Sequence, residues 1–385
     1  MRDSDTAGDR RSVLLIGLAV ASSLLGDVTI YTVLPVYHES LGLSPIEVGI
    51  ILSANRWVRL LTNQFPRRIS DRHRPRNVLG VFLLAGALIS LAYATHPPFW
   101  LFLVARMAWG AAWSYIRHAG VLGSLRAAAG RGATRTVGVY NGTVQTGFIV
   151  GTIAGGALFD AFGFSVAFVV LAVVSLSGLV FDYLGFRGVS FGDEPEGVGR
   201  SPGLRDEAGP LLRSFVTSCV GVGLIVSTLG FALEQRFGAT VEVGPLVIGV
   251  ATLNAVLIAL RYAVDGIGSP LVGTAVDRLG RRTAEVLAFS VGTVTLVAAA
   301  VLVASPLLVP LVIVFFVANV ASRLSLISRA GVAGAASFSR MVTASDVGSA
   351  SGPLIGWIAI DRAGSPDAVF AIGAALYAVA TVSAA

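Results

Sequence analysis

The chain has 385 residues, of which 55% are hydrophobic and only 13% are charged, with a formal net charge of +6. The charged fraction is about half of that in soluble globular proteins, which excludes an ordinary soluble domain and indicates a membrane protein. Basic residues stand in short clusters between apolar runs, so the positive charge indicates membrane loops and excludes a nucleic-acid partner.

The first apolar run, 13–37, follows a charged stretch that resembles the head of a signal peptide. The run is too long for a signal peptide and ends without a cleavage pattern, so we interpret it as a membrane span. A spanning helix needs roughly 20 apolar residues, and about eleven further runs of that kind follow. The predicted spans are 13–37, 45–66, 77–95, 98–122, 136–159, 163–186, 213–235, 246–275, 284–304, 306–328, 340–360 and 367–385.

The distribution of arginine predicts the orientation of the chain in the bilayer. Arginines cluster in the loops after the second, fourth and eighth spans, whereas the opposite loops carry only Arg236 and Arg362. Because cytoplasmic loops are enriched in basic residues, both termini are expected in the cytoplasm. The basic residues are arginines throughout, and with frequent alanine, glycine and valine this usage indicates a prokaryotic cell membrane.

One connector, 187–212, is rich in glycine, proline and acids and has no apolar periodicity, which indicates a cytoplasmic linker. It separates residues 1–186 from 213–385, so we expect an N-terminal and a C-terminal bundle of six helices each. SYIRHAGV at 114–121 is echoed by SLISRAGV at 325–332, which indicates a duplication. The expected fold is an all-α integral membrane protein with two pseudo-symmetric bundles and a site between them near the bilayer midplane.

A second repeat concentrates charge in two loops. RRISDRHRPR at 67–76 and GTAVDRLGRR at 273–282 place an aspartate and an arginine at equivalent positions, 277 − 71 = 206 residues apart. The second copy resembles the G-x-x-x-D-R-x-G-R-R loop motif of the major facilitator superfamily, and the span pattern resembles that family over the whole chain. The matching residues are Gly273, Asp277, Arg278, Gly280, Arg281 and Arg282, and the degraded first copy retains Asp71 and Arg72.

A carboxylate at a helix end can accept charge-assisted hydrogen bonds from guanidinium groups, while glycines permit a tight turn and a close approach. The resemblance implies that these loop residues form a cytoplasmic gate that closes one side of the protein and opens during turnover. The alternative is that they are only the basic loop charges of a membrane protein.

Spans five and eleven carry glycines four residues apart, which fall on one helix face and allow close backbone packing. The span-five series resembles the glycine motif of antiporters in this superfamily, with Thr152 in place of its proline. Dense helix packing alone explains the same pattern. The residues of the two series are Gly147, Gly151, Gly155, Gly156, Gly348, Gly352, Pro353 and Gly356.

Ionisable side chains inside a span are costly and mark a solute pathway, a proton relay or an ion pair. Asp27 in span one and Arg56 in span two lie at similar depths and can pair, and Arg59 extends the positive field on the same face of span two. Asp27 belongs to a stretch, DVTIYTVLP, that resembles span one of drug and proton antiporters. Asp27 is therefore either a proton carrier in a cavity or a member of a permanent ion pair.

Arg106 begins the stretch RMAWGAAWS in span four, which resembles a further antiporter motif with Trp109 where glutamine is usual. Trp109 and Trp113 share a helix face and can form a cavity wall for planar or lipophilic solutes, with Arg106 supplying charge. The alternative is that both tryptophans pack against neighbouring helices or lipid. Tyr31 is expected to line the same cavity.

In the second half, Arg261 and Asp265 are four residues apart in span eight and can pair along the helix. Arg323 in span ten has no partner nearby in sequence. We expect it to face the cavity or to pair with an acid from another helix, such as Asp265 or Asp346.

These features favour secondary active transport by alternating access, and in first place proton-coupled antiport, or efflux, of a small organic solute. Because the deep arginines outnumber the deep acids, uptake or facilitated movement of an organic anion is the alternative, and a non-transporting membrane receptor is the second. The sequence has no HExxH, Cys–His or P-loop motif, so we expect no enzyme, cofactor or metal site. The expected partners are the solute, protons and the lipid bilayer, and the expected state is a monomer.

Overall fold

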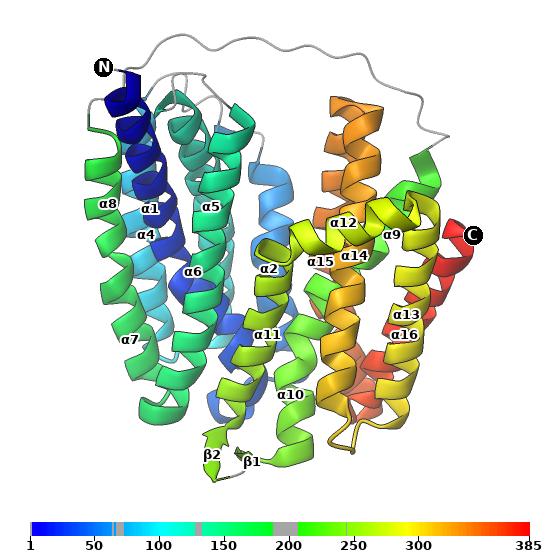
Figure 1. Cartoon of the computed structure of the whole chain (residues 1–385). Coiled ribbons are helices and arrows are strands. Elements are labelled where there is room, and N and C mark those ends of the chain that lie inside the picture. Colours follow the sequence, from blue (N-terminus) through cyan, green and yellow to red (C-terminus); the bar gives the residue numbers. More distant parts are fainter. Residues whose placement is uncertain (1, 64, 67–72, 128–132, 188–206, 244) are drawn as a thin grey trace. The chain divides into compact units, whose positions relative to one another are not determined.

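The structure is a computed structural model of the whole chain and describes residues 2–63, 65–66, 73–127, 133–187, 207–243 and 245–385 (Figure 1). The described residues are mostly helical, because a helix satisfies its backbone N–H and C=O groups internally where water is absent. The predicted all-α membrane fold is confirmed. Two compact units form: unit 1 from Met1–Val33 and Leu61–Glu196, and unit 2 from Leu34–Leu60 and Gly197–Ala385.

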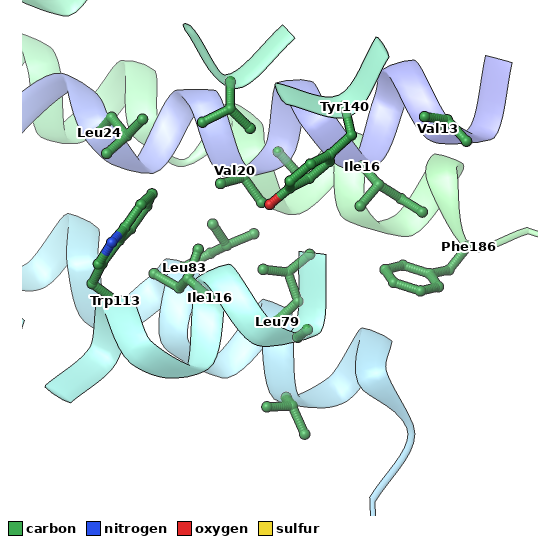
Figure 2. Close-up of a cluster of buried hydrophobic side chains, with 14 of the residues drawn as sticks. Val13, Ile16, Val20, Leu24, Leu79, Leu83, Trp113, Ile116, Tyr140 and Phe186 are labelled. Carbon is green, nitrogen blue, oxygen red and sulfur yellow. The ribbon is translucent and has the colours of Figure 1, made fainter. Parts of the chain in front are cut away.

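Unit 1 contains most of α1 (Arg2–Tyr37), with α4 (Pro75–Tyr93), α5 (Phe99–Ala127), α6 (Ala133–Phe162), α7 (Phe164–Ser175) and α8 (Ser177–Gly185). Helix α4 packs against α5, α7 and α8, and α6 packs against α5 and α7. In the core, Val20 and Leu24 of α1 lie among Leu83 of α4, Ile116 of α5 and the Tyr140 ring of α6 (Figure 2). This apolar packing fixes α1 and α5, which carry Asp27 and Arg106.

Unit 2 contains η1 (Glu39–Leu41), most of α2 (Pro45–Thr62), α9 (Ala208–Ser218), the π-helical η3 (Cys219–Ile225), α10 (Val226–Phe237), α11 (Val250–Gly266), α12 (Ser269–Leu279), α13 (Arg281–Val301), α14 (Leu308–Ala333), α15 (Ala335–Ala363) and α16 (Asp367–Ala384). Helix α2 begins with a capping box, in which the Glu47 carboxylate accepts from the Ser44 N–H at 2.8 Å and the Ser44 hydroxyl accepts from the Glu47 N–H at 3.4 Å. At Gly49, α2 lies directly against Trp357 of α15.

The predicted span over 246–275 does not form one continuous helix. Its first residues form strand β2 (Leu246–Gly249), which pairs antiparallel with β1 (Thr240–Val243). The rest is divided into α11 and α12, which are bent by 59° relative to each other. The change of direction between the two helices is visible in Figure 1. Pro270 follows the break and has no N–H to continue the hydrogen-bond ladder of α11, so the chain starts a new helix there.

Eight helical segments among the described residues are long and apolar enough to cross a membrane, and the bent pair α11–α12 makes a ninth if it is one span. The predicted spans 45–66, 98–122 and 340–360 correspond to α2, α5 and α15, which fall outside that set. These three helices carry many of the polar residues of the candidate site. Their passage through the membrane stays a prediction, as does the division of the chain at 187–212, where 188–206 lie outside the described residues.

Candidate functional site

A buried ion pair joins α1 and α5 in unit 1. The Arg106 side chain is 0% exposed; its Nη1 donates to Asp27 Oδ1 at 2.5 Å and its Nη2 donates to the Tyr31 hydroxyl at 3.2 Å. The guanidinium carbon also lies 5.3 Å from the centre of the Tyr31 ring. Asp27 and Tyr31 are one turn apart on α1, so all three predicted site residues form one connected group.

Asp27 therefore pairs with Arg106, which differs from the predicted pairing with Arg56. The Arg56 guanidinium lies in unit 2 and donates to the carbonyl oxygens of Val222, at 3.2 Å, and Ser349, at 2.6 Å. Similar depth along two helices does not determine which of their faces meet, and this is why the sequence suggested the wrong partner.

The two tryptophans of α5 lie in the core of unit 1. Trp109 and Trp113 are both buried, and their rings are stacked with centroids 6.2 Å apart. The Trp109 ring covers Gly86 of α4, where a Cβ would lie 2.6 Å from the ring. Both tryptophans thus pack against neighbouring helices, and their role as a cavity wall for a solute stays a prediction.

Unit 2 gathers a second set of ionisable side chains, which we call the arginine group. Arg323 of α14 pairs with Asp265 of α11, and an Arg59 nitrogen lies 3.6 Å from an Asp346 oxygen. Arg261 is buried one turn before Asp265 and lies within electrostatic reach of it. The arginine group consists of Arg56, Arg59, Arg261, Arg323, Asp265 and Asp346. Four arginines and two aspartates leave an excess of 4 − 2 = 2 positive charges among these described residues.

The structure also selects among the partners considered for Arg323. Its acid is Asp265 of α11, whereas Asp346 of α15 is paired with Arg59 of α2. Arg261 was expected to pair with Asp265 along the helix, but the ion pair of Asp265 runs to Arg323 instead. The ion pair of Asp265 thus runs between two helices, while Arg261 stays within electrostatic reach of the same acid.

Glycines bring helix backbones together in unit 1. The glycines of α6 that lie against α1 are Gly147, Gly151 and Gly155, and Gly156 is buried on the same helix. A Cβ on Gly147 would lie 2.6 Å from the Ala21 oxygen, and one on Gly151 would lie 3.0 Å from the Leu25 Cα. These distances leave no room for a side chain, so α6 and α1 approach as closely as backbones allow.

The corresponding series in unit 2 lies on α15 and faces α9, η3 and α10. Its members are Gly348, Gly352 and Gly356, which stand 348 − 147 = 352 − 151 = 356 − 155 = 201 residues after the first series. A Cβ on Gly352 would lie 2.6 Å from the Gly223 Cα of η3. On another face of α15, the Pro353 carbonyl lies under Gly49 of α2. The same residue type at one constant spacing thus makes the same kind of contact in both units.

The Major Facilitator Superfamily family model matches residues 16–353, which is most of the chain. This chain belongs to the major facilitator superfamily. A bacterial homolog to the human lysosomal transporter Spinster, in an inward-facing and occupied conformation, aligns with a TM-score of 0.78 at 13% identity over 97% of this chain and 95% of that chain. The nucleoside transporter NupG aligns with a TM-score of 0.74 at 11% identity over 97% and 98%. At these identities the structural likeness shows the fold alone.

A comparison with curated proteins gives no match. Membership of the superfamily nevertheless identifies the chain as a multi-pass membrane transporter for small solutes. Within the described residues, no group of three histidine, cysteine, aspartate or glutamate side chains is arranged to hold a metal ion.

The superfamily loop motif lies at the junction of α12 and α13. Gly280 has φ +80°, a conformation that other residues rarely adopt, so the turn requires glycine. Gly273 instead lies inside α12, where a Cβ would meet open space. Asp277 and Arg278 are exposed at the end of α12.

The remaining gate residues are only partly described. Arg282 donates to the backbone carbonyl of Ala385, and the side chain of Arg281 is not among those described. Asp71 and Arg72 lie outside the described residues. The gating role of this loop stays a prediction.

One buried ion cluster has no counterpart among the sequence predictions. Glu285 of α13 is buried, pairs with Arg213 of α9 at 2.5 Å and lies 3.7 Å from Arg329 of α14. A signal was present, because Glu285 falls just inside the predicted span 284–304, where an acid needs a partner. The partners themselves come from distant spans and are not evident from the sequence.

Proposed function

We propose that this transporter exchanges protons for a small organic solute and that Asp27 is the proton-carrying carboxylate. The observation that carries this proposal is the ion pair of Asp27 with the fully buried Arg106. An arginine side chain keeps its proton in proteins, so the proton that enters the pair must bind to Asp27. Protonation then changes the net charge of the pair from zero to +1 in a region where charge is costly.

That change of charge can couple the two movements. The ionised Asp27 carboxylate attracts a cationic or hydrogen-bond-donating solute, and its protonation removes the attraction. The proton and the solute therefore exclude each other at one group, which is the requirement for exchange. The Asp27 side chain keeps 12% of its surface exposed, so it is open to protons whereas Arg106 is not.

The test compares proton-driven transport by Asp27→Asn with that of the unmodified protein in proteoliposomes that carry an imposed pH gradient. Asparagine keeps the size of Asp27 and an oxygen that accepts from Arg106, so the variant should fold. We expect proton-driven exchange to be abolished in Asp27→Asn and retained in the control Asp361→Asn, which neutralises an exposed acid. Normal pH-driven transport by Asp27→Asn would remove Asp27 from the mechanism.

Uptake of an organic anion is a second candidate, and the arginine group of unit 2 favours it. Its excess of two positive charges would stabilise a carboxylate or phosphate in the membrane interior. In this mechanism, protonation of Asp27 would free Arg106 for the anion, so the proton and the solute would move together. Solute accumulation under an inward-directed acid gradient supports symport, whereas extrusion under the same gradient supports exchange.

A further inference from the structure

A cavity of about 610 Å³ opens in unit 2, where the beginnings of α9 and α13 meet the ends of α14 and α16. Arginines from three different helices line it, together with small residues of α9 and α16. The arginines are Arg213, Arg282 and Arg329. None of them belongs to the arginine group, so this is a separate charged site.

We propose that this cavity binds a phosphate-bearing anion, and specifically the headgroup of an anionic phospholipid. Glu285 is buried beside the cavity and pairs with Arg213, so it offsets one of the three guanidinium charges. Counting side chains alone, the three arginines and Glu285 leave an excess of 3 − 1 = 2 positive charges, and Arg282 also donates to the Ala385 backbone oxygen at the cavity wall. The Arg329 side chain is 53% exposed, so its guanidinium is accessible to a ligand.

Phosphate fits the chemistry of this cavity. The planar guanidinium group presents several N–H donors in a fork that matches phosphate oxygens. Gly209 and Pro210 bring the first turn of α9 to the cavity wall, and the positive end of the α9 dipole adds to the field of the arginines. The volume is in the range of small-molecule sites and exceeds the needs of a single phosphate, so it favours a phosphate that carries a larger organic group.

The surface beside the cavity indicates a lipid rather than a soluble metabolite. Leu212 is next to Arg213 and is 41% exposed, and Val382 is next to Ser383 and is 79% exposed. In a membrane protein, exposed apolar side chains of this kind contact acyl chains. A phospholipid fits both the cavity and the apolar surface beside it, because its phosphate contacts the arginines while its acyl chains cover the apolar residues. Basic residues at a membrane surface attract anionic lipids by about 1 kcal/mol each, or roughly fivefold in affinity.

The test uses the full chain in a neutral detergent and follows its thermal unfolding midpoint during titration with phosphatidylglycerol, phosphatidylcholine or inorganic phosphate. A ligand that binds the folded protein raises the midpoint in proportion to its affinity. The variants are Arg329→Gln and the double variant Arg282→Gln with Arg329→Gln. Arg329→Lys keeps the charge, and Arg278→Gln is the matched control, because it removes an exposed arginine four residues from Arg282 that does not line the cavity.

We expect phosphatidylglycerol to stabilise the unmodified protein and phosphatidylcholine to have little effect. The apparent affinity should fall about fivefold in Arg329→Gln and roughly 25-fold in the double variant, and stay unchanged in Arg278→Gln. An equal, arginine-dependent response to inorganic phosphate would support the phosphate site but assign it to a soluble ligand. The absence of stabilisation by either anion, or equal stabilisation of all variants, would overturn the proposal. These outcomes are read without transport, so they are independent of the role of Asp27.

Discussion

The two units bury their ionisable residues in different ways. In unit 1, the Arg106 guanidinium pairs with one acid, Asp27, and donates to the Tyr31 hydroxyl, so the charge of this ion pair is balanced. In unit 2, the arginine group has twice as many arginines as acids, and Arg56 uses backbone carbonyl groups as its acceptors. A balanced pair changes its net charge when a single proton arrives, whereas a group with excess positive charge attracts an anion at any moderate pH. This comparison is the basis on which we propose proton binding in unit 1 and attraction of negative charge in unit 2.

The largest expected effect comes from removal of the buried arginine of unit 1. Arg106→Met leaves Asp27 without its counter-ion, and breaking a buried pair in this way should cost about 3–5 kcal/mol of unfolding free energy. In unit 2, Arg323→Met should cost about 1 kcal/mol or less, since the Arg323 side chain is 32% exposed and water replaces it as a partner of Asp265. Unfolding of both variants by detergent titration measures the difference. Equal costs would show that the two units hold their charges alike.

The glycine contacts should give an intermediate effect that is similar in the two units. Gly151→Ala in α6 and Gly352→Ala in α15 each place a methyl group against a neighbouring helix backbone, which should cost about 1–3 kcal/mol. Gly273→Ala is the matched control, because a Cβ there meets open space and alanine favours a helix by about 0.5–1 kcal/mol. Thermal unfolding midpoints of the three variants provide the measurement. A destabilised Gly273→Ala, or a neutral Gly352→Ala, would contradict the packing.

The smallest effect is expected at an ion pair between Glu207, which lies outside the predicted spans, and Arg340, which is the first residue of one. Arg340 Nε donates to the Glu207 carboxylate at 2.6 Å, and this hydrogen bond lowers the pKa of Glu207 from its ordinary value of 4.5. A carboxylate whose pKa is lowered in the folded state stabilises the protein at pH values above its ordinary pKa. This contribution is lost as the pH falls through the lower pKa of the folded state. Glu207→Gln should therefore flatten the dependence of the unfolding midpoint on pH below about 4.5 and leave the deep sites of both units unaffected. If the unfolding midpoint of this variant depended on acidic pH in the same way as that of the unmodified protein, the loss of stability in acid would come from other carboxylates.

Much of the fold is evident in the sequence, because apolar runs of membrane length have few alternatives to a helix. The break near Gly268 and Pro270 also has a sequence signal, yet a continuous run of apolar residues on both sides concealed it. The π-helical segment Cys219–Ile225, which lies close against α15, has no comparable signal in the sequence.

The candidate site was only partly predictable for a physical reason. The free-energy cost of placing a charge inside a membrane indicates which ionisable residues need partners. Asp27, Arg106 and Arg323 were found in this way. The identity of each partner depends on helix rotation and on contacts between distant segments, so Arg106 was not assigned to Asp27. Glu285 was overlooked because it stands at the end of a span, where a charge is less conspicuous.

Two hydrogen bonds that Arg56 donates have a consequence for how this protein can vary. Its acceptors are the main-chain oxygens of Val222 and Ser349, which every amino acid possesses. Replacement of the side chain at either acceptor position leaves the main-chain oxygen in place. Of the residues that form these two hydrogen bonds between α2, η3 and α15, only Arg56 contributes its side chain. Related chains should be free to change residues 222 and 349 while they keep a long donor at position 56.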